Sequence, residues 1–132
     1  MYTLTLSGKF SAAHRLMKHS GKCVNLHGHT WKYEIELLTD EHQVGRDGIL
    51  VDFGYLKRIG EKLDHATLLN RADPLLTVLE QYPFRLVVLD GDPTAENLAK
   101  WMWDRVNEIH KIFIQVDVTI WEADNAKVTC ST

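Results

Sequence analysis

The chain has 132 residues, of which 45% are hydrophobic and 25% are charged, and this length and composition predict one soluble domain spanning residues 1–132. Its net charge of −3 argues against nucleic acid as a partner, because neutralising phosphate groups needs a basic face. No apolar run reaches the roughly 18 residues that a membrane span needs, so no membrane partner is expected. Two widely separated cysteines and the lack of a signal-like N-terminal pattern predict a cytoplasmic protein.

Apolar periodicity predicts an α+β fold in which two main helices pack on one face of an antiparallel β-sheet. Alternation of apolar and polar residues, or a short apolar run, predicts strands over residues 2–10, 31–39, 85–89, 112–122 and 126–130. Helical spacing of apolar residues predicts helices over residues 53–63, 74–82 and 94–110, with Thr94 as the N-cap of the last one. The order is β-β-α-α-β-β with small additions. The connection between the first two strands carries the candidates for a metal site.

Three histidines and a cysteine lie close together in the N-terminal part of the chain. His27 and His29 belong to the segment Cys-Val-Asn-Leu-His-Gly-His at residues 23–29. In an extended segment their side chains point to one face, roughly 6.6 Å apart along the backbone, and can converge on one cation. With His14 as a third ligand, a tetrahedral ion keeps one position open, as in catalytic sites. Cys23 strengthens this interpretation, although an inert buried thiol also fits.

Glu122 interrupts the pattern of the last long strand. It has the parity of Val118 and Ile120, so the apolar face of that strand ends in a carboxylate, which is costly to bury unless it is paired or hydrogen-bonded. Two interpretations stay open. Either the strand has ended and Glu122 is solvated, or its carboxylate lies at a pocket floor and accepts hydrogen bonds from a ligand with two adjacent N–H donors.

Several spaced motifs resemble the 6-pyruvoyl-tetrahydropterin synthase superfamily and run in family order over nearly the whole chain. The matching segments are FSAAHRL (10–16), CVNLHGH (23–29), VDF (51–53), LDH (63–65), Asn70, PTAENLA (93–99) and Glu122. The spacing in residues 23–29 is typical of the branch that acts in queuosine biosynthesis. The resemblance implies the tunnelling fold (T-fold), in which subunits join their sheets into a barrel. It also implies a homohexamer, a dimer of trimers, with active sites at the subunit interfaces.

The resemblance also implies a metal site and a catalytic set. It implies that Zn²⁺ is the cofactor, and the zinc ligands of the family match His14, His27 and His29. Cys23 matches the catalytic cysteine, and Asp64 with His65 matches a carboxylate–imidazole pair. Adjacent residues rarely face one another, so two arrangements of this pair stay open. Either a bent helix end lets Asp64 hold the His65 of its own chain, or the partner of Asp64 belongs to another subunit. His65 alternatively serves only to stabilise the C-terminus of its helix.

The substrate-binding residues follow from the same resemblance. Glu122 matches the acid that anchors the pterin ring, and Thr94 and Glu96 lie in a segment that lines the pterin site. Both have simpler interpretations, because Thr94 is a good N-cap and Glu96 is favoured near a helix N-terminus without any ligand. A triphosphate on the substrate either meets three basic residues or leaves them as a solvated loop: Arg15, Lys18 and Lys22.

The activity that the resemblance implies is a zinc-dependent carbon–carbon lyase that makes 6-carboxytetrahydropterin. Its substrate would be 7,8-dihydroneopterin triphosphate, and acetaldehyde and triphosphate would be released. One alternative is a 6-pyruvoyl-tetrahydropterin synthase, which eliminates triphosphate and keeps the three-carbon side chain. Another is a non-catalytic module that binds zinc or a pterin.

Overall fold

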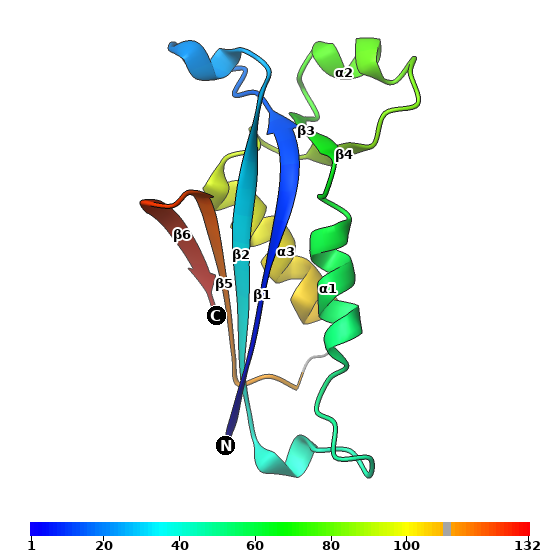
Figure 1. Ribbon diagram of the computed structural model, residues 1–132, viewed down its shortest axis with the longest axis vertical. Helices are drawn as coiled ribbons and strands as arrows, with labels where there is room; N and C mark the ends of the chain where they lie inside the picture. The colour runs from blue at the N-terminus through cyan, green and yellow to red at the C-terminus, as the bar shows by residue number, and fades with distance from the viewer. Residues whose placement is uncertain (110–111) are drawn as a thin grey trace.

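The computed structural model describes residues 1–109 and 112–132, so the predicted end of the last helix, near residue 110, lies outside the described residues. A six-stranded sheet has the strand order β4-β3-β1-β2-β5-β6 (Figure 1). The strands are β1 (Tyr2–His14), β2 (His27–Thr39), β3 (Ala66–Asn70), β4 (Leu86–Leu89), β5 (Gln115–Ala123) and β6 (Ala126–Ser131). The helices are α1 (Phe53–Glu61), α2 (Leu75–Leu79) and α3 (Ala95–Ile109), and 3₁₀ turns lie at Lys22–Val24 and Glu41–Gln43.

β1 and β2 form the long antiparallel pair that positions the candidate site. Their register pairs Tyr2 with Thr39 at one end and His14 with His27 at the other. Both strands are longer than predicted, and the three histidines lie in the strands themselves instead of in the connection between them. Alternation fades near the histidines because alanine, serine, threonine and glycine flank them. Pairing across the ladder, and not periodicity, therefore defines this end of the sheet.

The sheet is mixed, because its β3–β4 edge is parallel to β1. Ala12 of β1 lies opposite Ala66 of β3 in the parallel register, and β4 continues parallel to β3. The predicted antiparallel arrangement holds for β1, β2, β5 and β6. Periodicity does not predict β3, because Leu68 and Leu69 are both fully buried and the strand lacks the alternation of a half-exposed one.

α1 and α3 cover one face of the sheet, as predicted (Figure 1). α1 packs on β1, α3 packs on β5 and β6, and the two helices touch each other. Asp52 caps α1, because its side chain accepts from the Gly54 N–H at 2.7 Å. The core between helices and sheet includes the fully buried side chains of Phe10, Trp31, Ile35, Leu56, Leu98, Met102 and Ile120. In the part of the chain that the structure describes, no helix has the length and apolar character of a membrane-spanning segment.

The apolar core ends at the histidines. Phe10 stacks on Trp31 with ring centroids 5.8 Å apart. Trp31 in turn meets the ring of His14 edge-on, with centroids 4.9 Å apart. The His14 side chain is fully buried, so its imidazole has the core on one side and loops on the other. Tight packing of this kind leaves the ring few orientations.

Candidate metal centre

His14, His27, His29 and Glu122 converge at the end of the helix-covered face of the sheet. Each offers one ligand atom, and the four atoms all lie within 4.8 Å of one another. His14 ends β1 directly opposite His27 at the start of β2, and His29 follows two positions later on the same face. Glu122 comes from β5, the other neighbour of β2. Strand pairing thus brings together the three predicted ligands and the predicted pterin-binding acid.

Two backbone carbonyls fix the orientation of two of the rings. His14 Nδ1 lies 2.7 Å from the Pro93 carbonyl oxygen, and His27 Nδ1 lies 2.6 Å from the Asn25 carbonyl oxygen. A carbonyl only accepts, so both Nδ1 atoms donate and both Nε2 atoms present lone pairs when the rings are neutral. The two Nε2 atoms face each other at 3.1 Å. Ligand atoms about 2.0–2.1 Å from a tetrahedral ion lie about 3.3 Å apart, which is close to this separation.

His29 adds a buried ring nitrogen without a hydrogen-bond partner. Among the described residues its Nε2 atom makes no hydrogen bond, and the contact with Glu122 Oε1 at 3.2 Å lacks hydrogen-bond geometry. Glu122 Oε1 also lies 4.0 Å from His14 Nε2. An orphaned imidazole nitrogen beside two imidazole lone pairs and a carboxylate oxygen is a donor set that fits a divalent transition metal.

The protonation state of His14 suits metal binding. Burial lowers the pKa of His14, and the nearby rings of His27 and His29 lower it further; the hydrogen bond to Pro93 and the charge of Glu122 oppose this shift without reversing it. A pKa below the ordinary value leaves the ring neutral at pH 7, and the neutral ring is the form that coordinates a metal.

Cys23 is close to the cluster in sequence but is not part of it. It lies in the 3₁₀ turn Lys22–Val24 as a free, half-buried thiol, and its carbonyl accepts from the Leu16 N–H at 2.9 Å. The fourth group of the cluster is Glu122 and not Cys23. The thiol of Cys23 is therefore left out of this ligand set.

Asp64 and His65 face each other within one chain. His65 adopts the left-handed conformation, with φ of 57°, and this turn brings its Nδ1 atom to 2.9 Å from Asp64 Oδ2. Asp64 Oδ1 accepts from the Ser11 N–H at 2.9 Å, and the His65 N–H donates to the Ser11 carbonyl at 2.6 Å. The Ser11 hydrogen bond, followed by His65, lowers the pKa of Asp64. The bent chain after α1 thus makes the pair that adjacent residues rarely make.

The Asp64–His65 pair lies apart from the metal cluster of its own chain. Neither residue belongs to the cluster, and the Ser11 backbone that holds the pair is three residues, roughly 10 Å, before His14 along β1. The His65 side chain is 83% exposed. The structure therefore pairs Asp64 with His65 outside the metal cluster and leaves the imidazole of this pair exposed.

Thr94 and Glu96 lie at the start of α3. The Thr94 hydroxyl accepts from the Asn97 N–H at 3.2 Å, which confirms the predicted N-cap. Glu96 is an exposed acid in the first turn, where the helix dipole favours it. Pro93 immediately precedes Thr94 and contacts His14. This helix start therefore borders the cluster, although neither predicted residue belongs to it.

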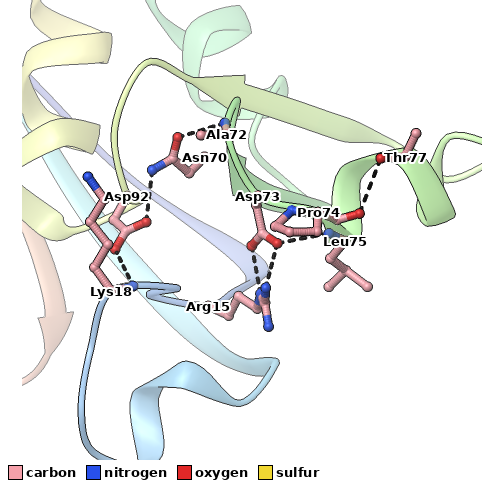
Figure 2. A network of polar contacts seen from close by, with 9 residues as sticks. All are labelled: Arg15, Lys18, Asn70, Ala72, Asp73, Pro74, Leu75, Thr77 and Asp92. Atoms are coloured by element: carbon pink, nitrogen blue, oxygen red, sulfur yellow. Dashed lines mark hydrogen bonds and ion pairs between the residues drawn. The ribbon is translucent and has the colours of Figure 1, made fainter.

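Arg15, one of the three basic residues considered for the triphosphate, has a partner inside the protein. Its Nε donates to Asp73 Oδ2 at 2.6 Å and its Nη2 donates to Asp73 Oδ1 at 2.5 Å (Figure 2). The Asp73 side chain is fully buried, and Asp73 Oδ1 also accepts from the Leu75 N–H at the start of α2 at 2.9 Å. Arg15, which directly follows His14, thus links the end of β1 to α2. Its guanidinium is engaged in this bidentate pair and is not part of a solvated loop.

The sequence also does not predict a second set of contacts next to the cluster. Asn70, at the end of β3, donates to Asp92, and Asp92 also accepts from the Lys18 N–H (Figure 2). The motif comparison includes Asn70 without giving it a role. Asp92 lies in an Asp-Gly-Asp-Pro turn, which predicts only a turn, so the sequence held no signal for this contact beyond the motif.

Comparison with known proteins identifies the family. The profile of the family described as 6-pyruvoyl tetrahydropterin synthase matches residues 3–132. A 6-carboxy-5,6,7,8-tetrahydropterin synthase of Haemophilus influenzae is 30% identical over 132 residues, covering 92% of this chain and 93% of that protein. A putative 6-carboxy-5,6,7,8-tetrahydropterin synthase of Pyrococcus horikoshii is 32% identical over 130 residues, covering 86% of this chain and 80% of that protein.

A solved structure gives the fold independently. A catalytic-residue mutant of 6-pyruvoyltetrahydropterin synthase from Plasmodium vivax has a TM-score of 0.72 at 18% identity, covering 99% of this chain and 97% of that chain. This likeness confirms the predicted α+β T-fold. Together with the profile match over nearly the whole length, it leads to one conclusion: the chain belongs to the 6-pyruvoyl tetrahydropterin synthase family.

Proposed function

We propose that this protein is a zinc-dependent 6-carboxy-5,6,7,8-tetrahydropterin synthase that acts in queuosine biosynthesis. It would convert 7,8-dihydroneopterin triphosphate and water to 6-carboxytetrahydropterin, acetaldehyde and triphosphate. Family membership and the names of the relatives support a tetrahydropterin synthase. The observation that carries the proposal is the convergence of three imidazoles, two of which are oriented by backbone carbonyls.

His14, His27 and His29 would hold the zinc ion. Two of these rings are already oriented by carbonyls, and the third has a buried nitrogen that makes no hydrogen bond among the described residues. When bound, zinc would lower the pKa of hydroxyl groups on the substrate side chain and polarise a developing carbonyl. The three imidazoles are neutral ligands, so they leave the full charge of the ion for this purpose.

Glu122 would anchor the pterin ring. Its side chain is 36% exposed, so the carboxylate can accept two hydrogen bonds from adjacent N–H groups of the ring while it stays beside the metal ligands. Thr94 and Glu96 would line the same pocket, because Pro93 directly before them contacts His14.

Cys23 and His65 would move protons. Cys23 is a free thiol outside the ligand set, so its sulfur is available as a general base or acid near the substrate side chain. Asp64 accepts from His65 Nδ1, which leaves Nε2 to exchange a proton with substrate. Because this imidazole is 83% exposed and does not belong to the cluster of its own chain, we infer that it serves the site of a neighbouring subunit in a homohexamer built as a dimer of trimers.

Product analysis tests the proposal directly. Zinc-loaded protein is incubated anaerobically with 7,8-dihydroneopterin triphosphate. Acetaldehyde is quantified by chromatography, and the pterin product is identified from its mass by mass spectrometry. We expect equal amounts of acetaldehyde and 6-carboxytetrahydropterin. A product that retains all three side-chain carbons would identify a 6-pyruvoyl-tetrahydropterin synthase instead. No turnover by metal-replete protein would leave the non-catalytic binding module.

A further inference from the structure

The loop between β4 and α3 touches the metal cluster at one point. The Pro93 carbonyl accepts from His14 Nδ1 at 2.7 Å, and this contact is buried. His14 is fully buried as well, so no water replaces the carbonyl without rearrangement. The orientation of this imidazole therefore depends on where the loop holds Pro93.

Asp92, the residue before Pro93, fixes that loop through both its carboxylate oxygens. Oδ1 accepts from Asn70 Nδ2 at 3.0 Å, and Oδ2 accepts from the Lys18 N–H at 3.3 Å (Figure 2). Its own carbonyl accepts from the Thr94 N–H at 2.8 Å and from Asn97 Nδ2 at 2.7 Å. Asp92 is thus tied to β3, to the loop after β1 and to the start of α3.

The hydrogen bonds of Asn70 determine which end of its side-chain amide faces Asp92. Its side chain is buried, with 4% of the residue exposed, and its Oδ1 accepts from the Ala72 N–H at 2.9 Å. That bond sets which end of the amide is the oxygen, so Nδ2 must point to Asp92 and donate. A residue at position 92 must therefore present an acceptor at both of its terminal side-chain atoms, which a carboxylate does and an amide does not.

The same carboxylate restrains the segment that carries Cys23. Lys18 lies between His14 and Cys23 in the chain, and the Leu16 N–H donates to the Cys23 carbonyl at 2.9 Å. The contact of Asp92 with the Lys18 N–H therefore closes this segment against the loop that holds Pro93. One side chain connects the support of a metal ligand to the support of the proposed proton carrier.

We propose that Asp92 is a positioning residue of the metal centre. It is not a member of the cluster, and it acts by holding the Pro93 carbonyl so that His14 keeps its proton on Nδ1 and its Nε2 lone pair toward the ion. Groups that hydrogen-bond directly to metal-ligating histidines typically change metal affinity by about 10–100-fold when removed, and Asp92 holds the loop whose Pro93 carbonyl does so for His14. The inference rests on the metal centre of the proposed function.

Cobalt binding to the intact protein tests this role, because Co²⁺ reports ligand geometry through its visible absorption. Asp92→Ala should weaken Co²⁺ binding by about 10–100-fold and alter the absorption bands. The thermal midpoint of the metal-free variant is measured beside it, because leaving the buried Asn70 amide unpaired also costs stability. Asp90→Ala is the matched control, since Asp90 lies in the same loop and its ion pair with Arg71 is exposed. The control should bind Co²⁺ as the wild type does.

A polarity exchange separates positioning from general damage to the loop. Asp92→Asn should weaken Co²⁺ binding, because the amide places its NH₂ group, itself a donor, opposite one of the two donors. The double variant Asn70→Asp/Asp92→Asn restores a donor opposite each acceptor and should recover the wild-type spectrum and most of the affinity. Should Asp92→Ala fail to fold, this pair of variants decides the question alone.

Two results would overturn the role of Asp92. One is an Asp92→Ala variant that binds Co²⁺ with wild-type affinity and spectrum, and the other is a double variant no better than Asp92→Asn. Either result, with acetaldehyde still produced by the wild type, leaves the proposed activity standing. Conversely, a wild type that binds Co²⁺ but makes no acetaldehyde contradicts the activity and not the role of Asp92.

Discussion

His14 and His27 face each other through Nε2 atoms 3.1 Å apart, while each ring donates from Nδ1 to a backbone carbonyl. The carbonyls and the facing nitrogens together set the chemistry of the site. Neither ring can turn its proton inward without losing a hydrogen bond, so the neutral rings present two lone pairs to one point. A divalent ion satisfies both at once, and the third imidazole and a carboxylate lie within reach of the same point.

Metal binding should stabilise the protein through His29. Adding Zn²⁺ at about 100 times its Kd should raise the free energy of unfolding by about 2.7 kcal/mol, and a chelator should reverse the gain. His29→Ala removes the orphaned nitrogen and should abolish most of this stabilisation. Urea unfolding with and without Zn²⁺ measures both effects. His42→Ala is the matched control, because that histidine is 84% exposed and lies outside the cluster. A zinc-dependent gain in stability that survives His29→Ala would show that zinc is not bound by these three histidines.

Glu122→Gln distinguishes a substrate anchor from a metal ligand. The amide keeps the shape of the side chain, but it lacks the negative charge and the second oxygen with which the carboxylate would accept hydrogen bonds from the pterin ring. The value of kcat/KM should therefore fall by about 10–100-fold. Zinc stoichiometry should stay at one per chain. Steady-state kinetics and elemental analysis of the same preparation give the two values. Loss of the metal together with the activity would instead make the carboxylate the fourth ligand.

Cys23→Ser should slow the chemical step and spare the metal. A serine hydroxyl is a far weaker base than a thiolate, and loss of general acid–base assistance typically costs about 10²–10⁴-fold in kcat. Because Cys23 lies outside the ligand set, metal content should match the wild type. Single-turnover kinetics on zinc-loaded protein checks the rate. Cys130→Ser, at the other free thiol, should keep the wild-type rate.

Subunit mixing tests whether His65 serves a neighbouring site. Cys23→Ala and His65→Ala should each be inactive alone. When equal amounts are unfolded together and reassembled, about one quarter of the sites would combine an intact thiol with an intact imidazole from two subunits. Activity recovered in the mixture supports shared sites, since the pair is held on Ser11 and faces outward. A mixture as inactive as its components would place both groups in one chain.

The Arg15–Asp73 pair should make the free energy of unfolding depend on pH in the acid range. Arg15, and to a smaller extent the Leu75 N–H, lowers the pKa of Asp73. A carboxyl with a depressed folded-state pKa stabilises the fold fully above its unfolded pKa of about 3.9, and this contribution is lost as pH falls through the folded-state pKa. Asp73→Asn should therefore lower the free energy of unfolding by about 1–3 kcal/mol at pH 7.

Urea unfolding at two pH values checks this dependence. The difference between wild type and Asp73→Asn should shrink as the pH falls through the lowered folded-state pKa of Asp73, because the protonated carboxyl, like the amide, carries no charge. Asp90→Asn is the control, because its partner Arg71 is exposed and exposed ion pairs contribute little. An equal loss at both pH values would show that packing, and not charge, is what Asp73 supplies.

The sequence predicted the parts of the site that local geometry determines. His27 and His29 were predicted to share a face because residues two apart in a strand do so, and Thr94 was predicted to cap α3 because its hydroxyl can reach the first-turn N–H groups. The long alternating and helical patterns predicted the antiparallel strands and both main helices. These features need no knowledge of distant contacts.

Distant contacts explain what the sequence did not predict. Leu68 and Leu69 of β3 point to opposite faces of the sheet, and both are buried by contacts that only the folded chain supplies. The bond of His14 to Pro93 spans 79 positions, and that of Arg15 to Asp73 spans 58, so neither leaves a periodic signal. The turn at His65 depends on the Ser11 backbone, which holds both its N–H and the Asp64 carboxylate. Polar pairs of this kind become visible only once the sheet register is known.

An anomalous difference map from crystals of the zinc-loaded protein tests the central claim most directly. We expect one zinc peak per chain, about 2.0–2.1 Å from the Nε2 atoms of His14, His27 and His29, with a remaining coordination position held by water or substrate. A peak elsewhere, or a zinc ion whose every position is filled by protein atoms, would contradict a catalytic metal centre at this site.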